Sequence, residues 1–150
     1  MKIVRYEKEF IEDVIAYEKT LRIEESDWGW EINEEYIKNV TSSFFDGKFQ
    51  NSISFVAYFD DKIVGRIDAC LIPSHFDESV KAYLDWICVL KSYRHKGVAQ
   101  ALMKKLRTTL KEEYIVDTLI GLIASNDEAQ RFYKSLENSL IRDQGIWIDC

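Results

Sequence analysis

The sequence predicts one α/β domain over residues 1–150, with a mixed, mostly antiparallel central sheet and helices on both faces. Three β-rich runs follow one another through short connections, at Ser52–Phe59, Ile63–Ile72 and Val80–Leu90, and such connections favour antiparallel pairing. Apolar residues at helical spacing flank them on both sides in the chain. The apolar run Ile115–Ser125 has the composition of a strand covered by helices on both faces.

In the N-terminal third, alternation at Lys2–Tyr6 predicts a short strand. An apolar stripe over about Lys8–Ile23 predicts a helix. Asn33 is a cap residue for a second helix, which we expect to end at Asp46-Gly47. The next two strands are joined by a hairpin turn at Asp60–Lys62.

In the C-terminal third, the helical pattern that follows the third strand begins close to Gly97. Asn126 is placed to cap a last helix that runs to about Leu136. Alternation over Leu140–Cys150 predicts a terminal strand or hairpin. The predicted order of elements is therefore β-α-α-β-β-β-α-β-α-β.

Composition excludes several classes of protein. The net charge of -6 and the pI near 5.0 argue against nucleic-acid binding and favour cationic small substrates. Neither a signal-peptide core nor an apolar run of membrane-spanning length is present, so we expect a cytoplasmic protein without a membrane partner. Cys70, Cys88 and Cys150 are typical of reduced thiols, and two histidines without paired ligands predict no metal site.

A basic turn follows the third long strand, at Arg94-His95-Lys96-Gly97-Val98-Ala99. Backbone N–H groups at a helix start lack partners within the helix, and the helix dipole makes that end partly positive. Gly97 allows close approach of an anion, and the flanking cations add charge. The turn matches neither the Walker loop nor the dinucleotide fingerprint, so it predicts a different phosphate or pyrophosphate site.

This hexapeptide resembles the [QR]-x-x-G-x-[GA] signature of the GNAT N-acetyltransferase superfamily. A second segment, Asn126 to Tyr133, resembles the N-x-x-A-x-x-[FL]-Y segment of the same family. The order and separation of the two are more specific than either alone, and the resemblance covers essentially the whole chain. One departure is Glu137-Asn138, which stands where the family usually has a Gly-Phe pair.

The resemblance implies acetyl-CoA as co-substrate and direct transfer to an amine. The pantetheine arm would pair with backbone groups of the third long strand, and the pyrophosphate would lie on the basic turn. The implied cofactor-binding residues are Ile87, Cys88, Val89, Arg94, His95, Lys96, Gly97, Val98, Ala99, Asn126 and Tyr133.

Two side chains are candidate catalysts. Asp85 interrupts an apolar strand, where burial would make its carboxylate a stronger base for a protonated amine, and Asp68 in the adjacent strand is the reserve. Tyr133 matches the family's tyrosine and can protonate the departing thiolate. The alternatives are an outward-facing, ion-paired Asp85 and a Tyr133 that only packs.

The segment Glu24–Glu31 places two tryptophans among carboxylates. Carboxylates and π faces suit an ammonium group, so Asp27, Trp28, Trp30 and Glu31 are the predicted substrate-binding residues, with Glu24 and Glu25 adding charge. The alternative is a solvated acidic loop. We therefore expect an acetyltransferase for a small cationic amine; a peptide acetyltransferase, a non-catalytic acyl-CoA-binding module and a homodimer stay open.

Overall fold

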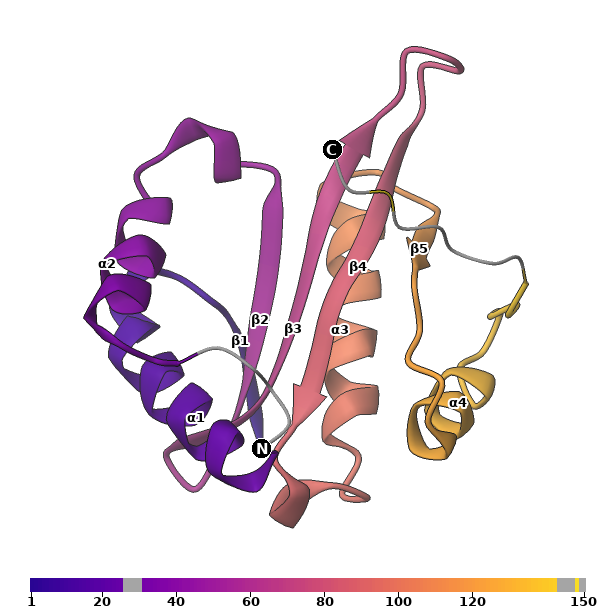
Figure 1. The fold of residues 1–150 in the computed structure, drawn as a ribbon. Coiled ribbons are helices and arrows are strands. Elements are labelled where there is room, and N and C mark those ends of the chain that lie inside the picture. Colours follow the sequence, from indigo (N-terminus) through magenta and orange to yellow (C-terminus); the bar gives the residue numbers. More distant parts are fainter. Residues whose placement is uncertain (26–30, 143–147, 149–150) are drawn as a thin grey trace. The chain divides into compact units, whose positions relative to one another are not determined.

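The computed structural model describes residues 1–25, 31–142 and 148. Two compact units make up the chain, Met1–Ile120 and Gly121–Cys150, and each is described by itself. The prediction of a single domain stays a prediction. Among the described residues, the first unit holds four strands and most of a fifth, together with three of the four α-helices (Figure 1).

The sheet has the strand order β1-β2-β3-β4-β5. Its strands are β1 (Lys2–Arg5), β2 (Ser52–Phe59), β3 (Lys62–Pro73), β4 (Val80–Val89) and β5 (Leu119–Gly121). Neighbours among the first four strands pair antiparallel. Asp60 and Asp61 join β2 to β3, and both have positive φ angles, 47° and 61°. This is the geometry of a two-residue type I′ turn, whose twist matches that of the strands, so the predicted hairpin is confirmed.

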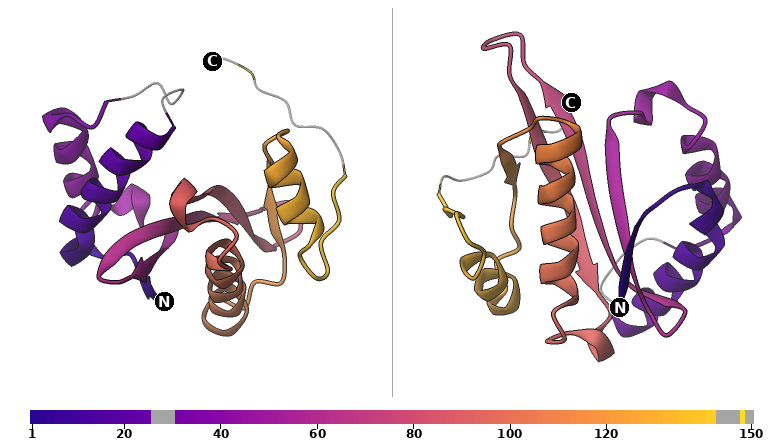
Figure 2. Two further views of the ribbon diagram at one scale, coloured as in Figure 1. Left: turned by 90° about the horizontal axis from the view of Figure 1, so that it is seen from below. Right: turned by 180° about the vertical axis from the view of Figure 1, so that it is seen from behind.

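Helices cover both faces of this sheet, as the sequence predicts. The α-helices are α1 (Ile11–Glu24), α2 (Glu34–Ser43), α3 (Val98–Glu113) and α4 (Asp127–Lys134). Figure 2 shows α1 and α2 on one face of the strands and α3 on the other. The Asn33 side chain accepts from the N–H of Tyr36 at 2.9 Å, and the Asn126 side chain accepts from the N–H of Ala129 at 2.9 Å. Both predicted caps are confirmed.

Apolar side chains fill both layers. Val14, Tyr17 and Leu21 of α1 are buried, as are the apolar residues of α3 that face the sheet. Gly65 of β3 permits a close approach of α3, because a Cβ there would lie 3.0 Å from a methyl carbon of Val98. The packing therefore holds the start of α3 against the centre of the sheet.

The structure differs from the prediction after α3. The strand expected over Ile115–Ser125 is only three residues long, because Ile115 takes a positive φ of 55° and the Val116 N–H donates back to the Leu110 carbonyl. These residues close the end of α3 instead of pairing. Residues 140–142 and 148 are not in a strand, and the rest of the predicted terminal strand lies outside the described residues.

Candidate active site

A β-bulge interrupts β4 at Asp85. Trp86 lies opposite Asp68 of β3, whereas Leu84 lies opposite Ala69, so Asp85 has no partner in this ladder. A bulge reverses which peptide groups point to each side of a strand. Before the bulge, the Ala82 N–H points away from β3 and donates to the Thr118 carbonyl at 2.9 Å.

After the bulge, the peptide groups of Ile87 and Val89 point away from β3. Leu90 donates its N–H to the Val64 carbonyl at 2.9 Å. Alternation along an antiparallel ladder then directs the groups of Cys88 towards β3 and those of Ile87 and Val89 to the opposite side. The orientation is the one that the predicted pairing with a pantetheine arm requires. The Val89 carbonyl itself accepts from Arg94 Nε at 3.1 Å.

The turn between β4 and α3 has the geometry of an anion site. Gly97 is the N-cap of α3 and adopts a left-handed conformation, with φ 78°. A Cβ at Gly97 would meet nothing within 4 Å, so the space above the backbone is open. The first turn of α3 carries no acidic side chain to compete with an anion. Lys96 adds positive charge, with its Nζ 4.8 Å from the Tyr93 ring centroid.

The side chain of Arg94 binds Glu25 and the end of β4 in this structure. Its Nη2 lies 2.5 Å from Glu25 Oε1, and its Nε donates to the Val89 carbonyl. Glu25 also pairs with Lys91 at 3.2 Å. Both carboxylates, Glu24 and Glu25, thus bind the segment between β4 and α3, and their contribution to an acceptor site stays a prediction.

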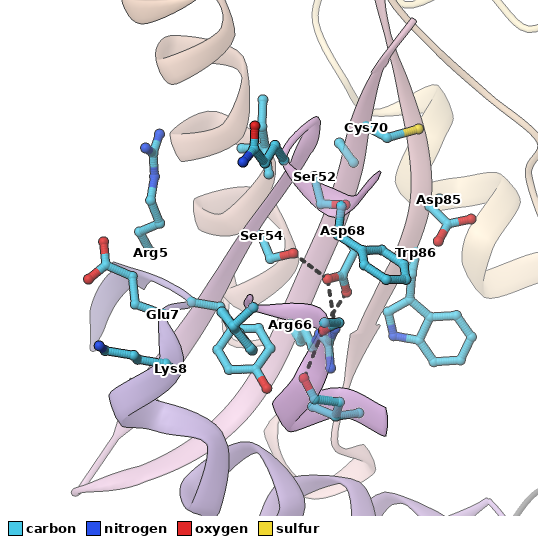
Figure 3. A pocket seen from close by; sticks show the side chains of 18 of the residues that line it. Arg5, Glu7, Lys8, Ser52, Ser54, Arg66, Asp68, Cys70, Asp85 and Trp86 are labelled. Carbon is cyan, nitrogen blue, oxygen red and sulfur yellow. Dashed lines mark hydrogen bonds and ion pairs between the residues drawn. The ribbon is translucent and has the colours of Figure 1, made fainter. Parts of the chain in front are cut away.

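A cavity of about 870 Å³ lies on the face of the sheet that α1 and α2 cover. Residues from β1, α1, α2, β2, β3 and β4 line it, and Figure 3 shows Asp68, Asp85 and Trp86 among them. Its ring-bearing side chains are Tyr6, Tyr36, Phe44, Phe49, Trp86 and Tyr114. The bulge of β4 therefore opens onto a large, partly aromatic cavity.

A charged network forms one wall of this cavity. Asp68 accepts from Ser54 Oγ at 2.5 Å and from Arg66 Nη2 at 2.8 Å, while Arg66 Nη1 lies 3.5 Å from Glu18 (Figure 3). Burial raises the pKa of Glu18, although Arg66 and Arg22 oppose the shift. The Tyr6 ring lies beneath the Arg66 guanidinium, and burial raises the pKa of the Tyr6 hydroxyl to about 12. Asp68 is therefore held by several donors.

The two candidate bases differ in surroundings. Asp85 is exposed, so the burial expected from its apolar strand is absent. The β-bulge at Asp85 breaks the alternation of buried and exposed side chains along β4, so Asp85 does not take the buried position expected of it. Asp85 contributes to the raised pKa of Cys70, of which burial is the larger cause. The assignment of Asp85 as base stays a prediction.

Tyr133 and Asn126 belong to the second unit. Tyr133 lies on α4 with its ring centroid 5.1 Å from that of Phe132. Burial raises the pKa of Tyr133, so its hydroxyl stays protonated well above neutral pH, as a proton donor requires. Asn126 caps α4. The roles of both residues towards the cofactor stay predictions.

Four residues are predicted from the sequence to bind the acceptor. Asp27, Trp28 and Trp30 lie outside the described residues, and Glu31 is exposed. The cavity instead brings forward Tyr36, Phe44 and other residues that no local pattern marks, because they are distant in the chain. Among the sequence predictions, the assignments of Asp85 as the candidate base and of Asp68 as its reserve pointed to this region.

Two of the cysteines, Cys70 and Cys88, are free thiols. Burial raises the pKa of the Cys88 thiol to about 11, which suits a packing role.

Within residues 1–25, 31–142 and 148, no cluster of three or more His, Cys, Asp or Glu could hold a metal ion. In the same part of the chain, no helix is long and apolar enough to cross a membrane. A cytoplasmic location stays a prediction.

Comparison with known proteins identifies the family of the chain. The model of the acetyltransferase (GNAT) family matches residues 17–137. The matched segment includes the bulged strand, the β4–α3 turn and α4. The chain therefore belongs to the GNAT family, whose members are N-acetyltransferases.

Individual relatives share only a low sequence identity with the chain. The chain is 24% identical to N-alpha-acetyltransferase 30 of Schizosaccharomyces pombe over 106 residues, which are 71% of this chain and 69% of the relative. An aminoglycoside acetyltransferase from an uncultured soil metagenomic sample, in complex with sisomicin, superposes with a TM-score of 0.84 at 16% identity, covering 99% of this chain and 95% of the other.

A ribosomal-protein-alanine N-acetyltransferase from Brucella melitensis biovar Abortus superposes with a TM-score of 0.75 at 14% identity, covering 100% of this chain and 99% of the other. At these identities the two structural likenesses establish the fold. They confirm the mostly antiparallel sheet with helices that the sequence predicts.

Proposed function

We propose that the chain transfers the acetyl group of acetyl-CoA directly to the amine of a small cationic acceptor bound in the cavity on the α1/α2 face. The observation that carries the proposal is the charge of that cavity beside the bulge. Six of its lining residues are acidic, Glu7, Glu9, Glu18, Asp46, Asp68 and Asp85, and three are basic, Arg5, Lys8 and Arg66. Such a wall attracts cations and disfavours anionic acceptors.

The cofactor assignment rests on backbone groups. The first-turn N–H groups of α3 and the open space above Gly97 fit a pyrophosphate. The outward peptide groups of Ile87, and the N–H of Val89, fit an extended arm that adds to the strand edge. Acetyl-CoA supplies the thioester, and these residues bind and orient it.

The acceptor assignment rests on Asp85 and Trp86. Both line the cavity at the bulge, and Trp86 presents an indole ring there (Figure 3). An ammonium packed against an aromatic face gains about 0.5–2 kcal/mol. Glu18 and Asp68 are already paired with Arg66, so Asp85 is better placed than either to meet an acceptor cation.

The proposed chemistry needs three proton transfers. The acceptor ammonium gives a proton to Asp85, its nitrogen forms a bond to the acetyl carbon, and the carbon–sulfur bond breaks. Tyr133 protonates the departing thiolate, and the second proton of the acylated nitrogen passes to the resulting phenolate or to solvent, which leaves a neutral amide. Asp85 contributes proximity to the amine, and Tyr133 contributes a hydroxyl that burial keeps protonated.

A peptide acceptor is the second candidate, because one relative and one structural neighbour are named as protein N-acetyltransferases. A panel of polyamines, aminoglycosides, neutral amines and N-terminal peptides, assayed for acetyl-CoA-dependent release of free thiol, separates the possibilities. We expect cationic small amines to give the highest kcat/KM, with a KM that rises as salt is added.

Two outcomes contradict the proposal. Preferred turnover of peptides would make the chain a protein acetyltransferase. Tight binding of acetyl-CoA, without thiol release for any amine or peptide, would make it an acyl-CoA-binding module.

A further inference from the structure

The carboxylates at the C-terminal end of α1 hold the first part of the segment that leads from β4 to α3, from Lys91 to Arg94. Glu24 Oε2 accepts the Lys91 N–H at 2.6 Å, and Lys91 Nζ donates to the Glu24 carbonyl at 2.6 Å. Glu25 binds Lys91 and Arg94. The end of α1 is thus tied to a turn 67 to 69 residues away in the chain.

Arg94 connects three pieces of this arrangement. It follows the 3-10 turn Lys91–Tyr93, its Nε holds the carbonyl of Val89 at the end of β4, and its Nη2 holds Glu25. The Arg94 and Glu25 side chains are only 24% and 20% exposed, so solvent screens the pair less than it screens a surface pair. A guanidinium suits this role because its donors have a fixed planar geometry.

We infer that Glu25 is a positioning residue for the cofactor site, and that Arg94 acts through this brace and not as a direct phosphate ligand. The pyrophosphate is then bound by the backbone N–H groups at the start of α3 and by Lys96. The brace fixes where the turn leaves β4, and so fixes the direction of those N–H groups. This inference rests on the proposed acetyl-CoA site.

A direct phosphate contact by Arg94 predicts the opposite behaviour for Glu25. In that arrangement Glu25 competes with the phosphate for the guanidinium, so its removal would tighten the binding of CoA. In the brace, removal of Glu25 loosens the turn and weakens binding. The sign of one substitution therefore separates the two arrangements.

The experiment measures CoA binding by calorimetry for the parent, Glu25→Gln, Arg94→Gln and the double variant, at several salt concentrations. Glu113→Gln is the matched control, because it removes an exposed ion pair, between Glu113 and Arg5, in which neither Glu25 nor Arg94 takes part. We expect each single variant to bind CoA about fivefold more weakly, and the double variant to bind no more weakly than the weaker single one.

Two further readouts distinguish positioning from direct contact. The slope of CoA affinity against salt should be the same in Arg94→Gln and in the parent, because no phosphate contact is removed. The melting temperature of the unliganded protein should fall in both single variants. Glu113→Gln should change neither the salt slope of CoA affinity nor the melting temperature.

Tighter or unchanged CoA binding in Glu25→Gln would overturn the inference, and so would a reduced salt slope in Arg94→Gln. If Arg94→Gln does not fold, the sign of the Glu25→Gln effect alone decides. Failure of the parent to bind CoA would instead contradict the proposed function, so the two failures are distinguishable.

Discussion

The β4–α3 turn and the cavity on the α1/α2 face are built in different ways. The turn contains one contiguous segment, Arg94–Ala99, whose proposed function rests on backbone N–H groups and one left-handed glycine. The cavity is assembled from side chains of four strands, two α-helices and the segments between them, which span residues 5 to 114. A site made of backbone can be identified from a short motif, whereas a site made of side chains depends on how the elements pack.

The largest expected effect tests the turn. Gly97→Asp adds strain at a φ of 78° and places a negative charge where the pyrophosphate is proposed to lie. Strain of about 1–2 kcal/mol favours a relaxed free turn that must be reordered on binding, and with repulsion of about 2 kcal/mol it predicts a loss of CoA affinity of several hundredfold. Calorimetry checks it, with Gly47→Asp as the control, since a Cβ there meets only the flexible end of Gln50 at 3.9 Å. Equal affinity in parent and variant would remove the cofactor from this turn.

The second effect tests the catalytic step. Tyr133→Phe keeps the ring and removes the hydroxyl, so kcat should fall about 100-fold while CoA affinity is unchanged. Because burial raises the pKa of Tyr133, the hydroxyl stays protonated past its usual titration. Loss of parent activity through ionisation of Tyr133 should therefore occur only above the pH range in which an ordinary tyrosine titrates. An unchanged kcat, with chemistry shown to be rate-limiting, would leave Tyr133 as a packing residue.

The third effect compares the two carboxylates beside the bulge. Asp85→Asn should remove the acidic limb of the pH–rate profile. It should lower kcat only about tenfold, because Asp85 is exposed and water can partly replace it as the base.

Asp68→Asn is the comparison variant, and it should chiefly lower the melting temperature, because the buried Arg66 guanidinium loses the negative charge of its carboxylate partner. A pH–rate profile that changes in Asp68→Asn but not in Asp85→Asn would exchange their roles.

The smallest effect tests the aromatic part of the cavity. Trp86→Leu removes the indole face and keeps an apolar side chain, so KM for the best cationic amine should rise about fivefold, for a loss of about 1 kcal/mol. The KM for a neutral amine, where one is accepted, should stay close to that of the parent. A steady-state comparison of the two acceptors checks this. Equal changes for both would indicate packing instead of cation recognition.

Much of the fold follows from patterns that are local in the chain. The Asn33 and Asn126 caps, the Asp60-Asp61 hairpin and the strand Ser52–Phe59 lie where the sequence places them. Caps, turns and alternation each depend on residues within a few positions, so one sequence is enough to predict them. The short β5 is an exception, because the left-handed conformation of Ile115 has no strong signal in the sequence.

The sequence by itself determined the family, the start of α3 close to Gly97 and the identity of the candidate catalysts. Only the tertiary structure decided that Asp85 is exposed at a bulge, that Arg94 is held by Glu25, and that Asp68 is bound by Ser54 and Arg66. The first group depends on backbone conformation and residue type within a short segment. The second depends on strand register and on pairs of charges up to 69 residues apart, which exist only once the helices pack on the sheet.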